Sequence, residues 1–436
     1  MSMGHRDGTG AQGLIEVDLG RVAPIVCGRM SRSTILVNVH GPDHPGISAG
    51  LMDVLTATGA DVYDIEQIVV RGRLTLNVLI GVDGETATIR DLLLFGWEQR
   101  LHIEFEVVDP LPTPMKPMTV VTVLGERIGP DDFGAVARAI ADGGGNIERI
   151  FRLSRYPVVS YELAVSDGDM HKVREQLIVA AAERPIDIAI QPEGLERRAK
   201  RMVVMDVDST LIENEVINLL ADEAGVGEKV AAITGAALRG EIDFEGSLRE
   251  RVALLAGLDE AALKRAAQRI TVTPGARTFI RTLRRMGMKT AIVSAGFTRF
   301  ANALAADLDI DYSLSNTLDV ADGVLTGKLA GEFVDGPRKA SFLREIAARE
   351  GIVTSQVVAI GDGANDLDML AAAGLGIAFN AKPVVRERAD TSVSVPYLDA
   401  ILFLMGVRRD HVEAADAADP NFDQGQLIDL PGIPPV

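Results

Sequence analysis

The sequence predicts an α/β protein of several domains, in which two βαββαβ repeats precede a doubly wound domain with a helical cap. Three observations support this architecture. An internal repeat runs through residues 33–192, short apolar runs alternate with helical patterns from residue 201 onward, and residues 214–272 read as an uninterrupted helical insertion. At 436 residues the chain is also too long for a single hydrophobic core.

Taken in order along the chain, the predicted segments are an N-terminal segment, two repeat domains, a third domain and an acidic tail. The Gly-rich N-terminal segment is expected to be mobile, and the tail to be poorly ordered or docked as a strap. The predicted boundaries are residues 1–30, 31–112, 117–194, 200–408 and 409–436.

The two repeats are aligned by a shared loop. The motif GPDHPG begins at Gly41 and GPDDFG begins at Gly129. Each copy reads strand, helix, strand, strand, helix, strand, which is the ferredoxin-like order. In the first copy we expect strands at residues 34–40, 60–70, 73–82 and 103–108, and helices at residues 47–59 and 88–96.

These repeats resemble the ACT domain, a small amino-acid-sensing module. The resemblance implies an amino-acid site in the first loop, because backbone amides at a helix start suit a carboxylate. The residues concerned are Gly41, Asp43, His44 and Gly46. It also implies a homodimer through these domains. The alternative is that the two domains only mediate dimerisation and do not sense an amino acid. The second loop is longer and altered, with the sequence GERIGPDD. Whether the second copy senses a ligand at all is therefore left open.

In the third domain, polar residues follow the predicted parallel strands. The strands are short continuous apolar runs at residues 202–207, 289–294, 356–360 and 374–379. In open α/β sheets the ligand site lies outside the carboxyl ends of the strands. The residues that gather there are Asp206, Asp208, Ser294, Asp362, Asn365 and Asp366.

Four carboxylates at one sheet edge would repel one another without a cation. Oxygen ligands with no histidine or cysteine favour Mg²⁺ over zinc. A lone aspartate pair more often caps the next turn, but acids after several strands make that reading weak.

Three charged residues fall at the apolar positions of predicted helices. They are Glu215, Arg251 and Lys339. A charge on a buried helix face needs a partner, and each alone could be a structural ion pair or a long side chain that reaches solvent. Together they favour a ligand site. Lys339 suits a phosphate, Arg251 suits a carboxylate and Glu215 suits an ammonium group, so the set predicts a phosphorylated amino acid.

The segments DVDSTLIENE, SAGF and GDGAND, with Lys339, resemble the four motifs of the haloacid dehalogenase superfamily, and most closely its phosphoserine phosphatases. The resemblance covers residues 200–405. It implies a Rossmann-like core and Mg²⁺-dependent hydrolysis of O-phospho-L-serine through an aspartyl-phosphate. That reaction is the last step of serine biosynthesis, and L-serine is the expected effector of the ACT domains.

The resemblance also implies roles for individual residues. Asp206 is the nucleophile and Asp208 the general acid and base. The Mg²⁺ ligands are Asp206, the backbone carbonyl of Asp208, and Asp362. The substrate-binding residues are Glu215, Arg251, Ser294, Ala295, Lys339 and Asn365, supported by Gly296 and Asp366. Ala295 departs from the more usual glycine, and a strained φ there would not suit alanine.

Three other functions remain open from the sequence. A different phosphatase of the same superfamily would keep the acids and leave Glu215 and Arg251 as structural ions. A phosphorelay receiver domain also has an acidic metal site, although the aspartate pair fits catalysis better. A non-catalytic amino-acid-binding regulator could be built on the repeats alone.

The composition excludes nucleic-acid partners and favours the cytoplasm. The net charge of −18 leaves no basic surface that could neutralise phosphates. A single cysteine, Cys27, cannot form a disulfide within the chain, as is usual in a reducing compartment. Neither a signal-peptide pattern nor a membrane-spanning apolar run is recognised. We therefore expect a cytoplasmic protein with no membrane partner.

Overall fold

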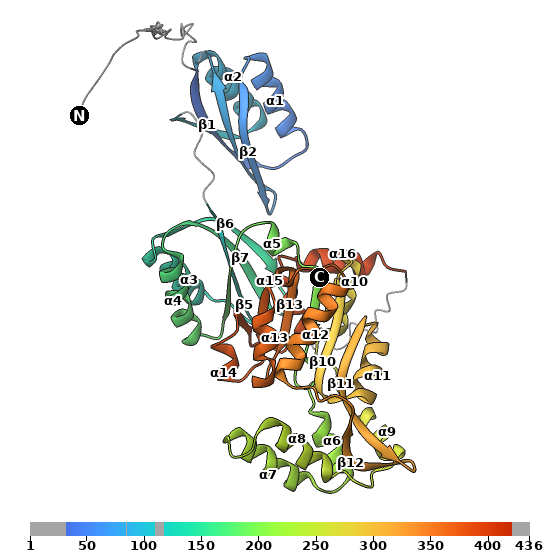
Figure 1. The fold of residues 1–436 in the computed structure, drawn as a ribbon. Coiled ribbons are helices and arrows are strands. Elements are labelled where there is room, and N and C mark those ends of the chain that lie inside the picture. The colour runs from blue at the N-terminus through green and yellow to red at the C-terminus, as the bar shows by residue number, and fades with distance from the viewer. Residues whose placement is uncertain (1–31, 84, 110–116, 421–436) are drawn as a thin grey trace, which may run out of the picture. The chain divides into compact units, whose positions relative to one another are not determined.

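The computed structural model describes residues 32–83, 85–109 and 117–420, and the chain forms two compact units, residues 1–115 and 116–436 (Figure 1). The predicted N-terminal segment lies outside the described residues. So does the last part of the tail, from residue 421. Among the helices within these ranges, none is both long and apolar enough to cross a bilayer.

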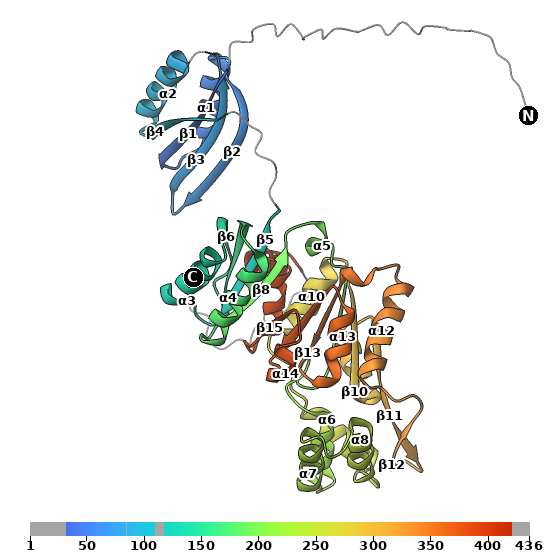
Figure 2. The ribbon, with the colours of Figure 1, turned by 60° about the vertical axis from the view of Figure 1, so that its left-hand side comes forward.

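The first unit is a βαββαβ domain, as predicted. Its antiparallel sheet has the order β2-β3-β1-β4. The elements are β1 (Ser33–Pro42), α1 (Ile47–Ala57), β2 (Asp61–Val70), β3 (Arg73–Val82), α2 (Glu85–Gln99) and β4 (His102–Val108). Alternate residues of β1 and β3 pack against α1 and α2, so the helices cover one face of the sheet (Figure 2). The edge strand β2 is exposed along its whole length.

The second unit begins with a domain of the same topology. Its elements are β5 (Thr119–Gly125), α3 (Pro130–Asp142), β6 (Gly145–Ser154), β7 (Val159–Asp167), α4 (Met170–Ala182) and β8 (Asp187–Pro192). The strand order β6-β7-β5-β8 repeats that of the first unit. One face of this sheet packs on α3 and α4, as in the first copy.

The other face of this second sheet packs against the third domain. Leu124 and Ala189 belong to the same apolar core as the third domain's strands. The side chain of Gln191 donates a hydrogen bond to the Leu404 carbonyl at 2.9 Å. The segment between the domains forms a short helix, α5 (Leu195–Arg198), whose buried Arg197 pairs with Glu162 at 2.5 Å. The second repeat is therefore joined to the third domain by both apolar and polar contacts.

The third domain is a doubly wound sheet of seven strands with β9 at its centre, in the order β12-β11-β10-β9-β13-β14-β15. Its strands are β9 (Met202–Met205), β10 (Lys289–Phe297), β11 (Tyr312–Ala321), β12 (Val324–Ala330), β13 (Val357–Gly361), β14 (Leu375–Phe379) and β15 (Thr391–Val393). Met202 and Val204 face one apolar core, and Val203 and Met205 face the other. Because both faces are covered, β9 is apolar at every position.

Helices cover both faces of this sheet. They are α10 (Ala276–Arg285), α11 (Thr298–Leu308), α12 (Gly336–Arg349), α13 (Leu367–Ala372), α14 (Pro383–Arg386) and α15 (Ile401–Leu404). α12 and α13 contribute to one core, whereas α10, α11 and α15 contribute to the other. The antiparallel hairpin β11–β12 was not predicted, since the sequence suggested only parallel strands here.

Four helices form the cap: α6 (Val216–Glu223), α7 (Gly227–Leu238), α8 (Phe244–Ala253) and α9 (Glu260–Gln268). They lie with β12 at one end of the sheet (Figure 1). The predicted tail begins with a helix, α16 (Arg409–Ala417), so its described part is ordered. Asp416 holds this helix against α10 through two hydrogen bonds from Arg281, each 2.9 Å long.

Candidate active site

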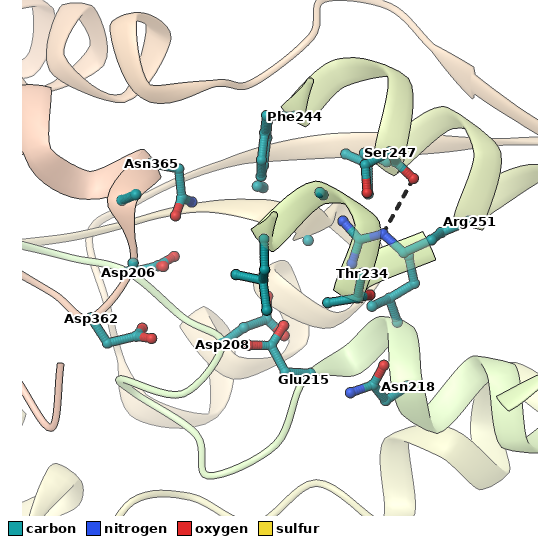
Figure 3. A pocket seen from close by; sticks show the side chains of 18 of the residues that line it. Asp206, Asp208, Glu215, Asn218, Thr234, Phe244, Ser247, Arg251, Asp362 and Asn365 are labelled. Atoms are coloured by element: carbon teal, nitrogen blue, oxygen red, sulfur yellow. Dashed lines mark hydrogen bonds between the residues drawn. The ribbon is translucent and has the colours of Figure 1, made fainter. Parts of the chain in front are cut away.

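A tight turn after β9 places two acids in one pocket. The carbonyl of Val207 accepts hydrogen bonds from the amides of Leu211 and Ile212, and Ser209 adopts a left-handed φ of 57°. This turn follows the last residue of β9, and Asp206 and Asp208 both line the same cavity of about 400 Å³ (Figure 3).

Asp206 belongs to a buried triad of charges. The Nζ atom of Lys339 lies 2.8 Å from Asp206 Oδ1 and 2.7 Å from Asp366 Oδ1, and the lysine is fully buried. Burial alone would favour a neutral amine, but the two carboxylates outweigh it and raise the pKa of Lys339. The lysine is therefore a fixed cation, and two carboxylates share its single charge.

Both carboxylate oxygens of Asp208 accept hydrogen bonds. The amide of Val216 donates to Oδ1 at 2.7 Å and the hydroxyl of Ser294 donates to Oδ2 at 3.0 Å. Burial, together with the nearby Glu215 carboxylate, raises the pKa of Asp208 to about 6. A carboxyl group with this pKa can hold a proton close to neutral pH, as a general acid must.

The acids can also hold a divalent cation. Asp206, Asp362 and Asp366 each offer an oxygen, and these atoms lie within 4.8 Å of one another. The oxygens of Asp366 already accept from Lys339 and from the amide of Gly363 at 2.9 Å, which leaves Asp206 and Asp362 as the better ligands. Burial, and then Asp366, raise the pKa of Asp362 to about 7. Such crowded carboxylates fit a hard cation that would offset their repulsion.

The cap residues differ from the prediction in one respect. Arg251 lies within α8 and is half-buried, as expected. Glu215 does not lie on a helix stripe: it is the N-cap of α6, with extended backbone and an exposed side chain. The periodicity argument for Glu215 was therefore wrong, although the residue lines the pocket. Figure 3 shows Arg251 on the side of the pocket opposite Asp362.

The SAGF segment at the end of β10 contributes backbone as well as a hydroxyl. Ala295 lines the pocket and does not adopt a positive φ, so alanine is accommodated without strain. Glycine is instead required at the next position, because a Cβ on Gly296 would approach Asp208 Oδ2 to 2.6 Å. The Gly296 amide donates to Ser294 Oγ at 2.7 Å. Asn365, from the GDGAND segment, also lines the pocket. Three predicted site residues are not among the lining residues but contact its acids directly or through one another: Ser294, Lys339 and Asp366.

The pocket also contains residues that the sequence reasoning missed. Phe244 and Ser247 come from α8, and Lys382 comes from the loop before α14. Phe244 and Ser247 precede Arg251 by seven and four residues, which places all three on one face of a helix. That spacing could have identified them once Arg251 was assigned to the pocket.

Comparisons with known proteins agree with this architecture. Residues 203–371 match the haloacid dehalogenase-like hydrolase family. Residues 33–106 and 118–191 each match an ACT domain family. The fold and the acidic pocket therefore define a haloacid dehalogenase-like hydrolase that carries two ACT domains. This match decides against a receiver domain, and the relatives below decide against a regulator without catalysis.

Two relatives cover nearly the whole chain. A phosphoserine phosphatase of Streptomyces coelicolor is 49% identical over 402 residues, which are 90% of this chain and 97% of that protein. One of Mycobacterium tuberculosis is 47% identical over 397 residues, 89% of this chain and 97% of that protein. The chain belongs to the phosphoserine phosphatase family.

A solved structure supports the same fold. A haloacid dehalogenase family hydrolase from Salmonella enterica serovar Typhi is 30% identical and superposes with a TM-score of 0.58. The alignment covers 66% of this chain and 98% of that one.

Proposed function

We propose that the protein hydrolyses O-phospho-L-serine to L-serine and phosphate with the aid of Mg²⁺, as the last step of serine biosynthesis in the cytoplasm. The observation that carries the proposal is the division of charge in one pocket. Asp206, Asp208 and Asp362 line one part, and Arg251 from the cap lies across from them. The named activity of the closely related proteins supports the same substrate.

The proposed reaction has two steps, because a carboxylate nucleophile divides the hydrolysis. A carboxylate oxygen of Asp206 attacks phosphorus while Asp208 gives its proton to the departing serine oxygen. Asp208 then takes a proton from a water molecule, whose oxygen attacks the aspartyl-phosphate and releases phosphate. Asp206 is regenerated as a carboxylate, and Asp208 is again protonated.

The other residues position and neutralise the phosphoryl group. Ser294, the Ala295 amide, Lys339 and Asn365 would bind its oxygens. Mg²⁺, held by Asp206, the Asp208 backbone carbonyl and Asp362, would supply positive charge near the phosphoryl oxygens. Phosphoryl transfer depends mainly on such positioning and charge neutralisation.

An assay of phosphate release tests the proposed substrate and the metal dependence. It is to be measured from L-phosphoserine and from an aryl phosphate, each with and without Mg²⁺. We expect a strong preference for phosphoserine that requires the metal. Equal rates on both substrates would keep the chemistry and remove the substrate assignment.

Arg251 gives a sharper test of substrate recognition. Within the described part of the chain its guanidinium has no carboxylate within 4.0 Å, so it can receive one from the substrate. Lysine cannot reproduce the planar fork of arginine. We expect Arg251→Lys to lower kcat/KM for phosphoserine by roughly 10- to 100-fold, while activity on an aryl phosphate stays within about twofold.

The matched control is Arg249→Lys, two residues away on the same helix. Its side chain is 53% exposed and pairs with Glu245. Both activities should be unchanged. A loss on both substrates in Arg251→Lys would assign Arg251 to structure instead.

We also propose that the first repeat binds L-serine as an effector. Gly46, with a φ of 99°, directly precedes α1, whose first turn contains no acid. In the second repeat, Asp131 and Asp132 occupy the first turn of α3, and Asp132 accepts from the Gly129 amide at 2.9 Å. Negative charge at a helix start disfavours a carboxylate ligand, so the first loop is the better candidate.

Calorimetry of the full chain with L-serine tests this effector site. We expect heat of binding that Asp43→Ala abolishes. The control is Asp131→Ala, at the equivalent position of the second repeat, which should bind as the wild type does. No heat of binding and no change in activity with L-serine would remove the effector role.

A homodimer is part of the proposal. The exposed β2 edge carries large apolar side chains, including Tyr63, Ile65 and Ile68, and its outer backbone groups have no strand partner among the described residues. Such an edge favours pairing with a second chain. A monomeric mass by light scattering would contradict it.

A further inference from the structure

Ser247 is a buried hydroxyl inside the pocket without a hydrogen-bond partner. Its side chain is 1% exposed and lines the cavity beside Arg251. Within the described residues, its Oγ atom makes no hydrogen bond. A buried hydroxyl that makes no hydrogen bond destabilises the folded protein, so a partner is expected.

The backbone around Ser247 brings the guanidinium of Arg251 close to this hydroxyl. Ser247 lies one turn before Arg251 in α8, and its carbonyl accepts a hydrogen bond from Arg251 Nε at 3.3 Å. This contact uses only the Nε–H group of the guanidinium. Its two terminal nitrogens have no carboxylate partner among the described residues. Figure 3 shows the Ser247 side chain next to the Arg251 head group.

Two unsatisfied groups therefore lie together on one face of the cap. A planar carboxylate can accept from the fork of an arginine and also from a hydroxyl, because each of its oxygens has two acceptor positions. A phosphoryl group is an unsuitable partner here, since the acids Asp206, Asp208 and Asp362 of the proposed phosphoryl site line the other part of the cavity, and Lys339 pairs with Asp206 there.

We propose that Ser247 is a specificity-determining residue whose hydroxyl donates a hydrogen bond to the substrate carboxylate held by Arg251. This inference rests on the proposed phosphoserine substrate. It adds a second, uncharged donor to the recognition of that group. The hydroxyl would help to reject phosphomonoesters that lack a carboxylate, because it then stays unpaired when the pocket is occupied.

The test compares O-phosphoserine with O-phosphoethanolamine, which has the phosphate and the ammonium but no carboxylate. For Ser247→Ala we expect the KM of phosphoserine to rise roughly tenfold with kcat little changed. The KM of phosphoethanolamine should not change, so the preference of the enzyme falls by the same factor. The melting temperature should stay equal or increase, because the variant removes an unpaired buried hydroxyl.

The matched control is Ser160→Ala in the second repeat. Ser160 is also fully buried, and its hydroxyl likewise has no partner in the described part of the chain, but it lies outside the pocket. Its kinetics on both substrates should equal those of the wild type.

The outcomes separate this inference from the function on which it rests. A wild type that prefers phosphoserine, with a Ser247→Ala variant that keeps the full preference, overturns the role of Ser247 alone. An equal loss on both substrates, or a lower melting temperature with unchanged preference, assigns Ser247 to structure. A wild type without any preference overturns the substrate assignment and the role of Ser247 together.

Discussion

Asp206→Asn is expected to reduce phosphate release by at least roughly 10,000-fold, the scale seen when a nucleophile is removed from other enzymes. Asparagine keeps the shape of the side chain and can accept hydrogen bonds, but its amide cannot attack phosphorus. The fold should be retained, because Lys339 keeps its contact with Asp366 at 2.7 Å. Steady-state phosphate release and a thermal melt measure the two effects.

Asp368→Asn is the control for this substitution. Asp368 lies in the adjoining α13, is exposed, and makes no ion pair among the described residues. Its activity should be unchanged. If Asp206→Asn kept a substantial rate with the same metal dependence, another group would have to be the nucleophile.

Lys339→Met is expected to have the largest effect on stability. The lysine is fully buried between Asp206 and Asp366, so its removal leaves two carboxylates without their cation. Breaking a buried ion pair in this way costs about 3–5 kcal/mol. Activity should also be lost, because the phosphoryl oxygens lose a fixed positive charge. Denaturant unfolding and phosphate release are the measurements.

The same helix provides a control in Arg344→Met. Arg344 is exposed and pairs with no acid in the described ranges. It should unfold within about 0.5 kcal/mol of the wild type, as surface substitutions usually do. A Lys339→Met variant of unchanged stability would show that the acids are neutral in the folded protein, contrary to the raised pKa of Lys339.

The elements around the acids could be predicted because they follow local rules. β9 is apolar on both faces and ends at the first acid, and the carboxyl ends of parallel strands meet at one edge. Lys339 lies on a regular helix, so periodicity placed it on the buried face correctly. The two repeats were recognisable because each is a complete βαββαβ unit.

The remaining features depend on contacts that periodicity does not encode. Glu215 has helical spacing to Val216 and Leu219 but caps the helix, since the turn after β9 uses the preceding residues. Ser247 is a small polar residue whose importance depends on Arg251 and on a missing partner. The hairpin β11–β12 has too little alternation to separate it from the parallel strands.

The buried sheet face of the second repeat has a consequence for modularity. The sequence divides the chain into three domains, but Leu124, Ala189 and Gln191 join the second repeat to the catalytic domain through apolar and polar contacts. Deleting it would expose an apolar surface and leave Arg197 without Glu162. The second repeat can therefore be inherited only together with the hydrolase domain that it covers.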